Sequence, residues 1–241
     1  MSILPQSFMR LVTVAIMALV LANCGRSEIY RYKLTLTINT PEGIKRGSSV
    51  VEVLFYEASF PERGTMHKLR GEALYLDLRP GARPLIALLT SQLRPKDPKD
   101  IRWSRDAGPT FNLLLPLYDV ARSDDIMITL RRIAAVRGPR RIAPADLPDL
   151  VTFTDINDPK SVIEVDPNNI QATLGSNLAW NEITLESTDE AVTEGIEARL
   201  PWLGEYYSSM LDGNRYQYLD ARKTIANSLS PADFWWPAKK R

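Results

Sequence analysis

The chain has 241 residues and a formal net charge of +1, with one cysteine and one histidine. A charge balance near zero argues against a nucleic-acid partner, because that binding depends on clustered lysine and arginine that neutralise phosphates. A lone cysteine cannot form an intramolecular disulfide, and with a lone histidine it leaves no thiolate or imidazole cluster for zinc or iron. We therefore expect no cofactor and no metal site.

The first segment has the pattern of an export signal. Arg10 precedes an apolar run from Leu11 to Ala22, and Cys24 follows directly after Asn23. This run of about 12 residues is shorter than the roughly 20 that a helix needs to span a bilayer. The segment resembles the signal and lipobox of bacterial lipoproteins, although Asn23 stands where that motif normally has Gly, Ala or Ser.

We expect residues 1–23 to be a signal peptide and Cys24 to be the lipidated residue, which makes a membrane the first partner. The alternatives are an ordinary signal peptide cut after Ala22, which would leave a soluble periplasmic protein, and an uncleaved anchor. Residues 24–241 are expected to form a single exported α+β domain, with a division near 91–110 as the alternative.

Strands dominate the first half of this domain. Alternating apolar and polar residues predict a strand at 30–39, and a β-rich run apolar on both faces predicts a more central strand at 49–56. A turn at 40–43 separates them, and a further strand pair is expected at 72–78 and 84–89. These strands predict an antiparallel sheet of four or more strands. Its expected buried residues are Leu34, Leu36, Val51, Val53 and Phe55.

Glycine and proline residues predict two connecting segments, a turn and a loop. The segment 79–82 contains Pro80 and Gly81, and proline at the first central position with glycine at the second predicts a type II turn. The stretch 91–109, rich in proline and charge, is expected to be a surface loop.

A helix is predicted in the middle of the chain. Asp125 and its neighbours offer side-chain oxygens as caps, and an apolar stripe runs until Gly138 and Pro139. Five arginines cluster near the expected end of this helix, where they either complement the helix dipole or contact anionic headgroups. The stripe residues are Ile126, Leu130, Ile133 and Ala134, and the arginines are Arg131, Arg132, Arg137, Arg140 and Arg141.

The second half alternates short strands and turns. Strands are expected at 150–153, 161–165 and 180–187, with a short helix that begins at Asp166 and Pro167 and closes at Gly175. The tail, from about residue 200 onward, is expected to be irregular and rich in aromatic residues.

Groups that can carry chemistry are few. His67 lies in a polar stretch with no nucleophile at a recognised spacing, so we interpret it as a loop residue exposed to solvent. The acidic segment 155–158 has oxygen ligands suited to Ca²⁺, but it lacks the glycine and distal glutamate of an EF-hand. An ordinary turn is the favoured interpretation, with a metal site of another type as the alternative.

Two aromatic groups stand out in the tail. They can form a partner-binding patch, or they can pack into the core. The residues of the expected patch are Trp202, Tyr206, Tyr207, Trp235 and Trp236, and Phe234 lies beside the last two.

Several short segments also carry a resemblance to a group of proteobacterial exported proteins with no assigned activity. The resemblance implies a bacterial origin and gives no catalytic residue. The segments that carry it are Tyr30–Thr35, Thr40–Gly43, Gly47–Val53, Val151–Phe153, Asp158–Pro159, Val165–Pro167, Gly195–Glu197 and Leu200–Leu203.

From these patterns we expect a cell-envelope lipoprotein that faces the periplasm and acts as a non-enzymatic binding module for an envelope protein or glycan. The alternative is a hydrolase or other enzyme acting on envelope material, with carboxylates such as Glu52 or Asp158 as acid and base.

Overall fold

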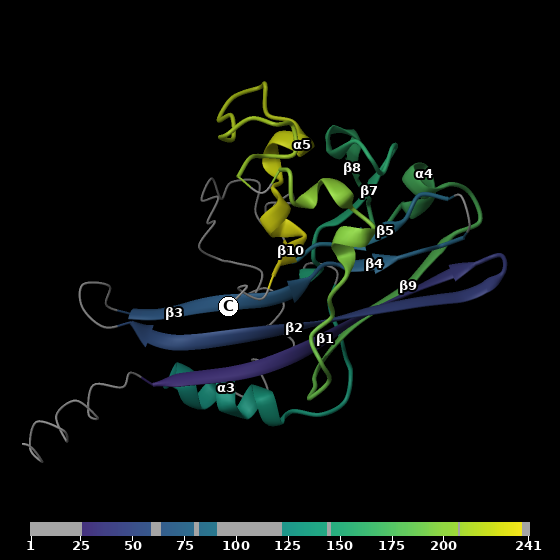
Figure 1. Ribbon diagram of the computed structural model, residues 1–241. Helices are drawn as coiled ribbons and strands as arrows, with labels where there is room; N and C mark the ends of the chain where they lie inside the picture. The colour runs from purple at the N-terminus through teal and green to yellow at the C-terminus, as the bar shows by residue number, and fades with distance from the viewer. Residues whose placement is uncertain are drawn as a thin grey trace, which may run out of the picture.

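A computed structural model describes residues 26–58, 64–79, 82–90, 122–143, 146–206 and 208–237. Within these ranges the chain forms ten strands in two antiparallel sheets and three short α-helices, which confirms the α+β class (Figure 1). The predicted division near 91–110, the loop at 91–109 and the central turn residues Pro80 and Gly81 lie outside the described residues.

The larger sheet is built on a long hairpin. It has six strands in the order β10-β3-β2-β1-β9-β6, and β1 pairs with β2 from Ser27↔Tyr56 to Thr40↔Gly43. The predicted turn at 40–43 therefore closes this hairpin, with Gly43 at a φ of 115° that favours glycine. The strand bounds are β1 Ser27–Thr40, β2 Gly43–Ala58, β3 Gly64–Glu72, β6 Arg140–Arg141, β9 Ala179–Ser187 and β10 Trp235–Trp236.

The smaller sheet has four strands in the order β4-β5-β7-β8. The chain enters it directly from the larger sheet, because β3 ends at Glu72 and β4 begins at Leu74. The prediction of one N-terminal sheet is therefore wrong: the strand pairs are right, but they belong to two sheets. The strand bounds are β4 Leu74–Leu76, β5 Leu85–Ala87, β7 Leu150–Phe153 and β8 Val162–Glu164.

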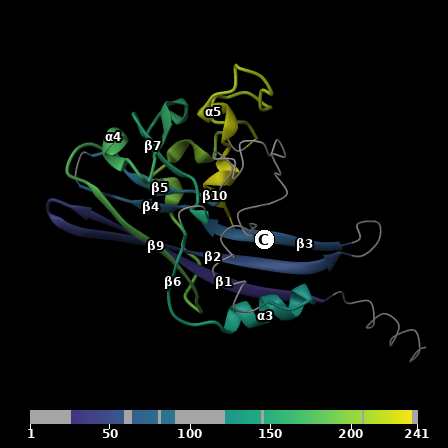
Figure 2. The same ribbon diagram turned by 180° about the vertical axis from the view of Figure 1, so that it is seen from behind.

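One face of β1 and β2 lines the main core. The alternating residues of β1 from Tyr30 to Ile38 are at most 4% exposed, and the five residues predicted to be buried are all confirmed. The same core cluster includes Leu130 of α3 (Ile126–Ala135) and Leu85 of β5. Helix α3 lies along β1, while the smaller sheet packs near the hairpin end (Figures 1 and 2).

Helix α3 begins where its cap predicts. The Asp125 side chain accepts a hydrogen bond of 2.9 Å from the Met127 N–H, and the helix ends at Ala135. Helix α4 (Ile170–Leu174) starts later than Asp166 and Pro167, because the Asp166 carboxylate caps a separate turn by accepting the Asn168 N–H. Gly175 closes α4 as expected.

The C-terminal segment forms a second core on the opposite face of the smaller sheet. Ile86 of β5 points into this second cluster, whereas its neighbours Leu85 and Ala87 point into the first. The segment is largely irregular, as predicted, and its short elements are η3 Ile196–Ala198, η4 Pro201–Leu203, α5 Ile225–Ser228 and η5 Pro231–Asp233. One further 3-10 turn, η2 Pro159–Ser161, lies between β7 and β8.

The other face of the larger sheet is polar and is crossed by the connection after β9. Lys33 of β1 binds Glu190 at 2.6 Å. The Val50 N–H of β2 donates a hydrogen bond to the Thr193 hydroxyl oxygen, and the Thr193 N–H donates one to the Val50 carbonyl oxygen. Figure 1 shows this connection passing over β1 and β2. A crossing segment covers part of this face of the sheet and leads the chain to the second core.

Candidate functional site

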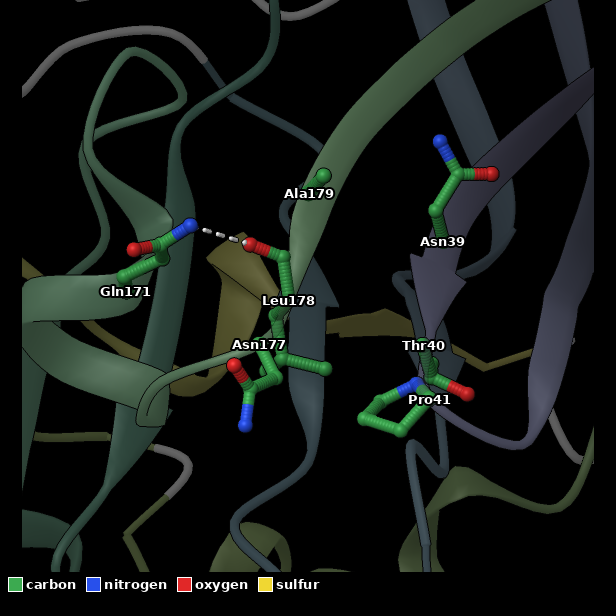
Figure 3. Close-up of a pocket in the computed structure, with 7 residues that line it drawn as sticks. All are labelled: Asn39, Thr40, Pro41, Gln171, Asn177, Leu178 and Ala179. Atoms are coloured by element: carbon green, nitrogen blue, oxygen red, sulfur yellow. Dashed lines mark hydrogen bonds between the residues drawn. The ribbon is translucent and has the colours of Figure 1, made fainter.

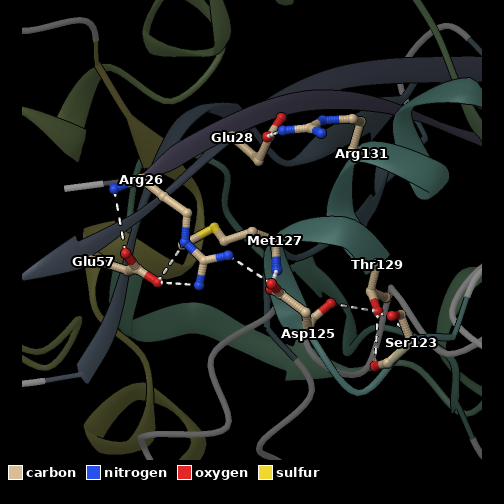
Figure 4. Close-up of polar contacts among 8 residues, drawn as sticks. All are labelled: Arg26, Glu28, Glu57, Ser123, Asp125, Met127, Thr129 and Arg131. Carbon is tan, nitrogen blue, oxygen red and sulfur yellow. Dashed lines mark hydrogen bonds and ion pairs between the residues drawn. The ribbon is translucent and has the colours of Figure 1, made fainter. Parts of the chain in front are cut away.

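The described fold begins two residues after Cys24, at Arg26. Its guanidinium binds the Glu57 carboxylate at 2.6 Å and the Asp125 carboxylate at 2.6 Å (Figure 4). These hydrogen bonds lower the pKa of both carboxyl groups. Arg131 of α3 also pairs with Glu28 of β1. Cys24 itself lies outside the described residues, but the chain that follows it is joined at once to the end of β2 and the start of α3.

Four of the five arginines near the end of α3 have side-chain partners among the described residues, namely Arg131, Arg132, Arg137 and Arg141. Arg137 Nη1 donates to the Ala134 carbonyl oxygen at 2.5 Å, which supports the interpretation that it complements the helix C-terminus. Arg141 pairs with Glu182 at 2.8 Å, because Arg140 and Arg141 form β6 and do not extend the helix. No helix within the described part of the chain is long and apolar enough to cross a bilayer.

The expected aromatic patch does not form as one surface. Trp202 is 4% exposed, its Nε1–H donates to the Ile156 carbonyl oxygen at 2.9 Å, and its ring packs against Phe234. Its place in the patch is therefore corrected: Trp202 fills the second core, because that core needs large side chains between an irregular segment and a small sheet. Tyr206 and Trp235 are half-buried, Trp236 is 39% exposed, and Tyr207 lies outside the described residues.

The carboxylates of the enzyme alternative have structural partners. Glu52 of β2 binds Arg31 at 2.8 Å and lies 3.8 Å from Arg70. Asp158 caps η2 by accepting the Lys160 N–H at 3.0 Å, next to the smaller sheet. Glu52 lies in the larger sheet and Asp158 in the connection between β7 and β8 of the smaller sheet, and no hydrogen bond or ion pair joins them in the described chain.

The acidic segment 155–158 forms a turn, as favoured. Asp155 Oδ1 accepts the Asn157 N–H at 3.0 Å, and the Ser161 hydroxyl donates to the Asp155 carbonyl oxygen at 2.7 Å. These hydrogen bonds are those of an ordinary turn closed by its own side chains. Across the described ranges, no group of three His, Cys, Asp or Glu side chains is arranged to hold a metal ion.

His67 and Glu72 both lie on β3, which the sequence analysis did not predict except for Glu72, the first residue of the strand expected at 72–78. His67 is half-buried against the Phe55 ring, with centroids 5.7 Å apart, so its assignment to an exposed loop is wrong, and burial lowers its pKa. Glu72 is 6% exposed and accepts the Ile196 N–H at 2.8 Å. Burial raises the pKa of Glu72, but the carboxylate serves as a cap for η3.

A protruding loop, which the sequence analysis did not single out, is the most organised irregular segment. We call residues 212–227 the Asn227 loop. The Asn227 side chain is fully buried. Its Nδ2 donates a hydrogen bond to the Asp212 carboxylate at 2.8 Å and another to the Tyr216 carbonyl oxygen at 3.2 Å. Its Oδ1 accepts a hydrogen bond from the Tyr218 N–H. Burial alone would raise the pKa of Asp212, but hydrogen bonds from Asn214 and Asn227 lower it overall. The buried side-chain amide of Asn227 thus links three separate residues of the loop by hydrogen bonds.

The loop presents apolar and basic groups to solvent. Leu219 is 100% exposed and Tyr216 is 69% exposed. Arginine side chains cover the tyrosine rings, with Arg222 lying 4.6 Å from the Tyr218 ring centroid and Arg215 lying 5.3 Å from that of Tyr216. The loop extends beyond α5 at the edge of the molecule (Figure 1). Binding residues in proteins are often carried by surface loops that a rigid scaffold positions.

Comparison of the chain with protein-family models, curated proteins and solved structures finds no match. The resemblance to the group of proteobacterial exported proteins therefore stays a prediction, and the candidate site rests on the geometry of this chain.

Proposed function

We propose that the protein is an exported cell-envelope lipoprotein, anchored through Cys24, that binds a protein partner through the Asn227 loop. It acts without chemistry of its own. The observation that carries this proposal is the loop itself, with a fully exposed Leu219 on a backbone held by the fully buried Asn227.

The fixed loop favours binding in energetic terms. Ordering a flexible segment when a complex forms costs free energy that is subtracted from the affinity. The Asn227 side chain and the bond of 2.8 Å from Gln217 Nε2 to the Ser228 carbonyl oxygen already order this loop in the free protein. Burying Leu219 and Tyr216 against a partner would then contribute about 25 cal/mol for each Å² of apolar surface removed from water.

The start of the fold suits an anchored protein. Only Gly25 separates Cys24 from Arg26, and two residue steps of extended chain reach about 7 Å. The contacts of Arg26 with Glu57 and Asp125 would therefore keep the corner formed by β1, β2 and α3 close to the bilayer. Two or more acyl chains, at roughly 0.8 kcal/mol for each buried CH₂, hold a protein on a membrane without a spanning helix.

Fatty-acid labelling in cells tests the anchor. Wild-type protein should carry the label and fractionate with membranes, whereas Cys24→Ser should lose the label and accumulate as the larger precursor. Asn23→Gly restores the residue that the lipobox normally has, so it should be processed at least as well as the wild type. Recovery of unlabelled wild-type protein that begins at Asn23 would overturn the anchor and indicate cleavage after Ala22.

Site-specific photocrosslinking tests the loop. A crosslinker placed at position 216 should yield one discrete protein adduct in cells, and Leu219→Asp should abolish that adduct. Ile44→Asp is the matched control, because Ile44 is also a largely exposed aliphatic residue, at 67%, but lies on β2 near the hairpin turn. An adduct that persists in Leu219→Asp, or that disappears equally in both variants, would contradict the proposed binding surface.

A further inference from the structure

A hollow lies at the end of β1 opposite Arg26. It has a volume of about 400 Å³ and lies between the β1–β2 turn on one side and the α4–β9 connection on the other (Figure 3). Asn39, at this end of β1, is 13 residues along the chain from Arg26. At roughly 3.3 Å per residue, the hollow is therefore about 43 Å from Arg26. The lining residues are Asn39, Thr40, Pro41, Gln171, Asn177, Leu178 and Ala179.

The chemistry of this lining is neutral and amide-rich. None of the seven residues is ionisable, and three of them carry carboxamides. Each carboxamide offers both donors and an acceptor, which is the hydrogen-bonding character of a hydroxyl group as well. Pro41 adds exposed apolar surface beside the polar groups, whereas Leu178 is 5% exposed and belongs to the main core (Figure 3).

The carboxamides retain capacity for a ligand. Asn39 Oδ1 accepts from Asn181 Nδ2 at 3.1 Å, which fixes the side chain and leaves its own amide hydrogens uncommitted within the described residues. Gln171 Nε2 donates to the Leu178 carbonyl oxygen at 3.0 Å, and its Oε1 is turned away from Thr40 and Pro41 (Figure 3). The Asn177 side chain makes no hydrogen bond to any described residue, and it is exposed at the mouth of the hollow.

We propose that this hollow binds a neutral, polyhydroxylated ligand, namely a short stretch of uncharged glycan. Sugar hydroxyls pair with the carboxamides, and the C–H face of a sugar ring packs against Pro41. Several lining residues are exposed, so the hollow is open to solvent and a longer glycan can continue past it. An open site of this kind gives weak affinity, because much of the ligand stays in water.

The test measures binding of defined oligosaccharides to the full chain in lipid nanodiscs by biolayer interferometry. The neutral probes are chitotetraose, which is N-acetylated, and maltotetraose, which is not. The comparison probes are polygalacturonate, which is anionic, and a tetra-alanine peptide. A preference between the two neutral probes identifies the type of glycan, and saturable binding of either one supports the proposal.

Asn177 allows a clean variant. Its φ of 70° is a conformation that glycine adopts readily, so Asn177→Gly removes the carboxamide without backbone strain. Losing one such hydrogen bond should weaken binding about threefold to tenfold. Asn168→Ala is the control, because Asn168 is an exposed carboxamide near α4 that does not line the hollow.

The site is separate from the anchor and from the Asn227 loop, so Cys24→Ser and Leu219→Asp should leave glycan binding unchanged. Three results would overturn the proposal: no saturable binding of either neutral probe, equal or tighter binding of polygalacturonate or the peptide, or an unchanged affinity in Asn177→Gly. None of these results bears on whether Cys24 is lipidated or whether the loop binds a protein.

Discussion

The hydroxyl groups of Tyr30 and Tyr32 lie in the main core without a hydrogen-bond partner among the described residues. Both side chains are at most 3% exposed. A buried donor without a partner costs about 1–3 kcal/mol. Tyr32→Phe removes that cost and keeps the ring, so it should raise the free energy of unfolding by about 1–3 kcal/mol at pH 7.

The same burial predicts alkaline sensitivity. Burial raises the pKa of both tyrosines well above the value of about 10 that they have in an unfolded chain. Above pH 10 the unfolded state releases these protons while the folded state retains them, so stability is complete below pH 10 and falls as the pH rises. At pH 11 each tyrosine should lower the free energy of unfolding by about 1.4 kcal/mol relative to its value well below pH 10.

Urea denaturation at pH 7, 9 and 11 measures both effects. The Tyr30→Phe/Tyr32→Phe double variant should lose less stability between pH 9 and 11 than the wild type, by up to about 2.8 kcal/mol. Tyr216→Phe is the control, because Tyr216 is 69% exposed. This substitution should change neither the free energy of unfolding at pH 7 nor its loss between pH 9 and 11. The reasoning is refuted if Tyr32→Phe lowers the unfolding free energy by about 1 kcal/mol or more, since a hidden partner would then bind the hydroxyl.

Three further substitutions test the fold and the loop. Leu36 is fully buried, so Leu36→Ala should cost about 2–5 kcal/mol in a urea melt, and an unchanged midpoint would contradict its place in the core. Gly71 has a φ of 138°, and an added Cβ would lie 3.1 Å from the Val50 carbonyl oxygen; Gly71→Ala should therefore destabilise the protein by at least about 1 kcal/mol, and equal thermal stability would argue against this backbone. Asn227→Ala should loosen the loop, so trypsin should cleave after Arg215 or Arg222 faster than in the wild type; equal cleavage rates would mean that the amide does not hold the loop.

Local patterns predicted the elements whose signals lie within a few residues. The alternation along 30–39 predicted β1 because its even-numbered side chains face one core, and Asp125 predicted the start of α3 because its carboxylate caps the next amides. The division into two sheets was not predictable in this way. The chain changes sheets at Ala73, between Glu72 and Leu74, and the nearby Gly71 lies inside β3 and does not mark a turn.

Elements that depend on distant partners were missed. Strand β3 has the sequence GTMHKLRGE, which lacks a clear apolar alternation, and it becomes a strand by pairing with β2. Trp202 is buried because Phe153 and Phe234 surround it, and neither lies near it in sequence. The Asn227 loop could have been suspected from Leu219 and its tyrosine neighbours in a polar stretch, but its order comes from one buried amide.

The position of Arg26 determines how mechanical load enters the molecule. Tension applied through the N-terminus reaches the fold at Arg26 and continues along β1, which is hydrogen-bonded to β2 on one side and to β9 on the other. A pull directed along the strand would strain many of these hydrogen bonds together in shear and would not open them one by one. The contacts of Arg26 with Glu57 and Asp125 share the load with β2 and α3. A domain pulled from its N-terminus in this way would resist unfolding under tension.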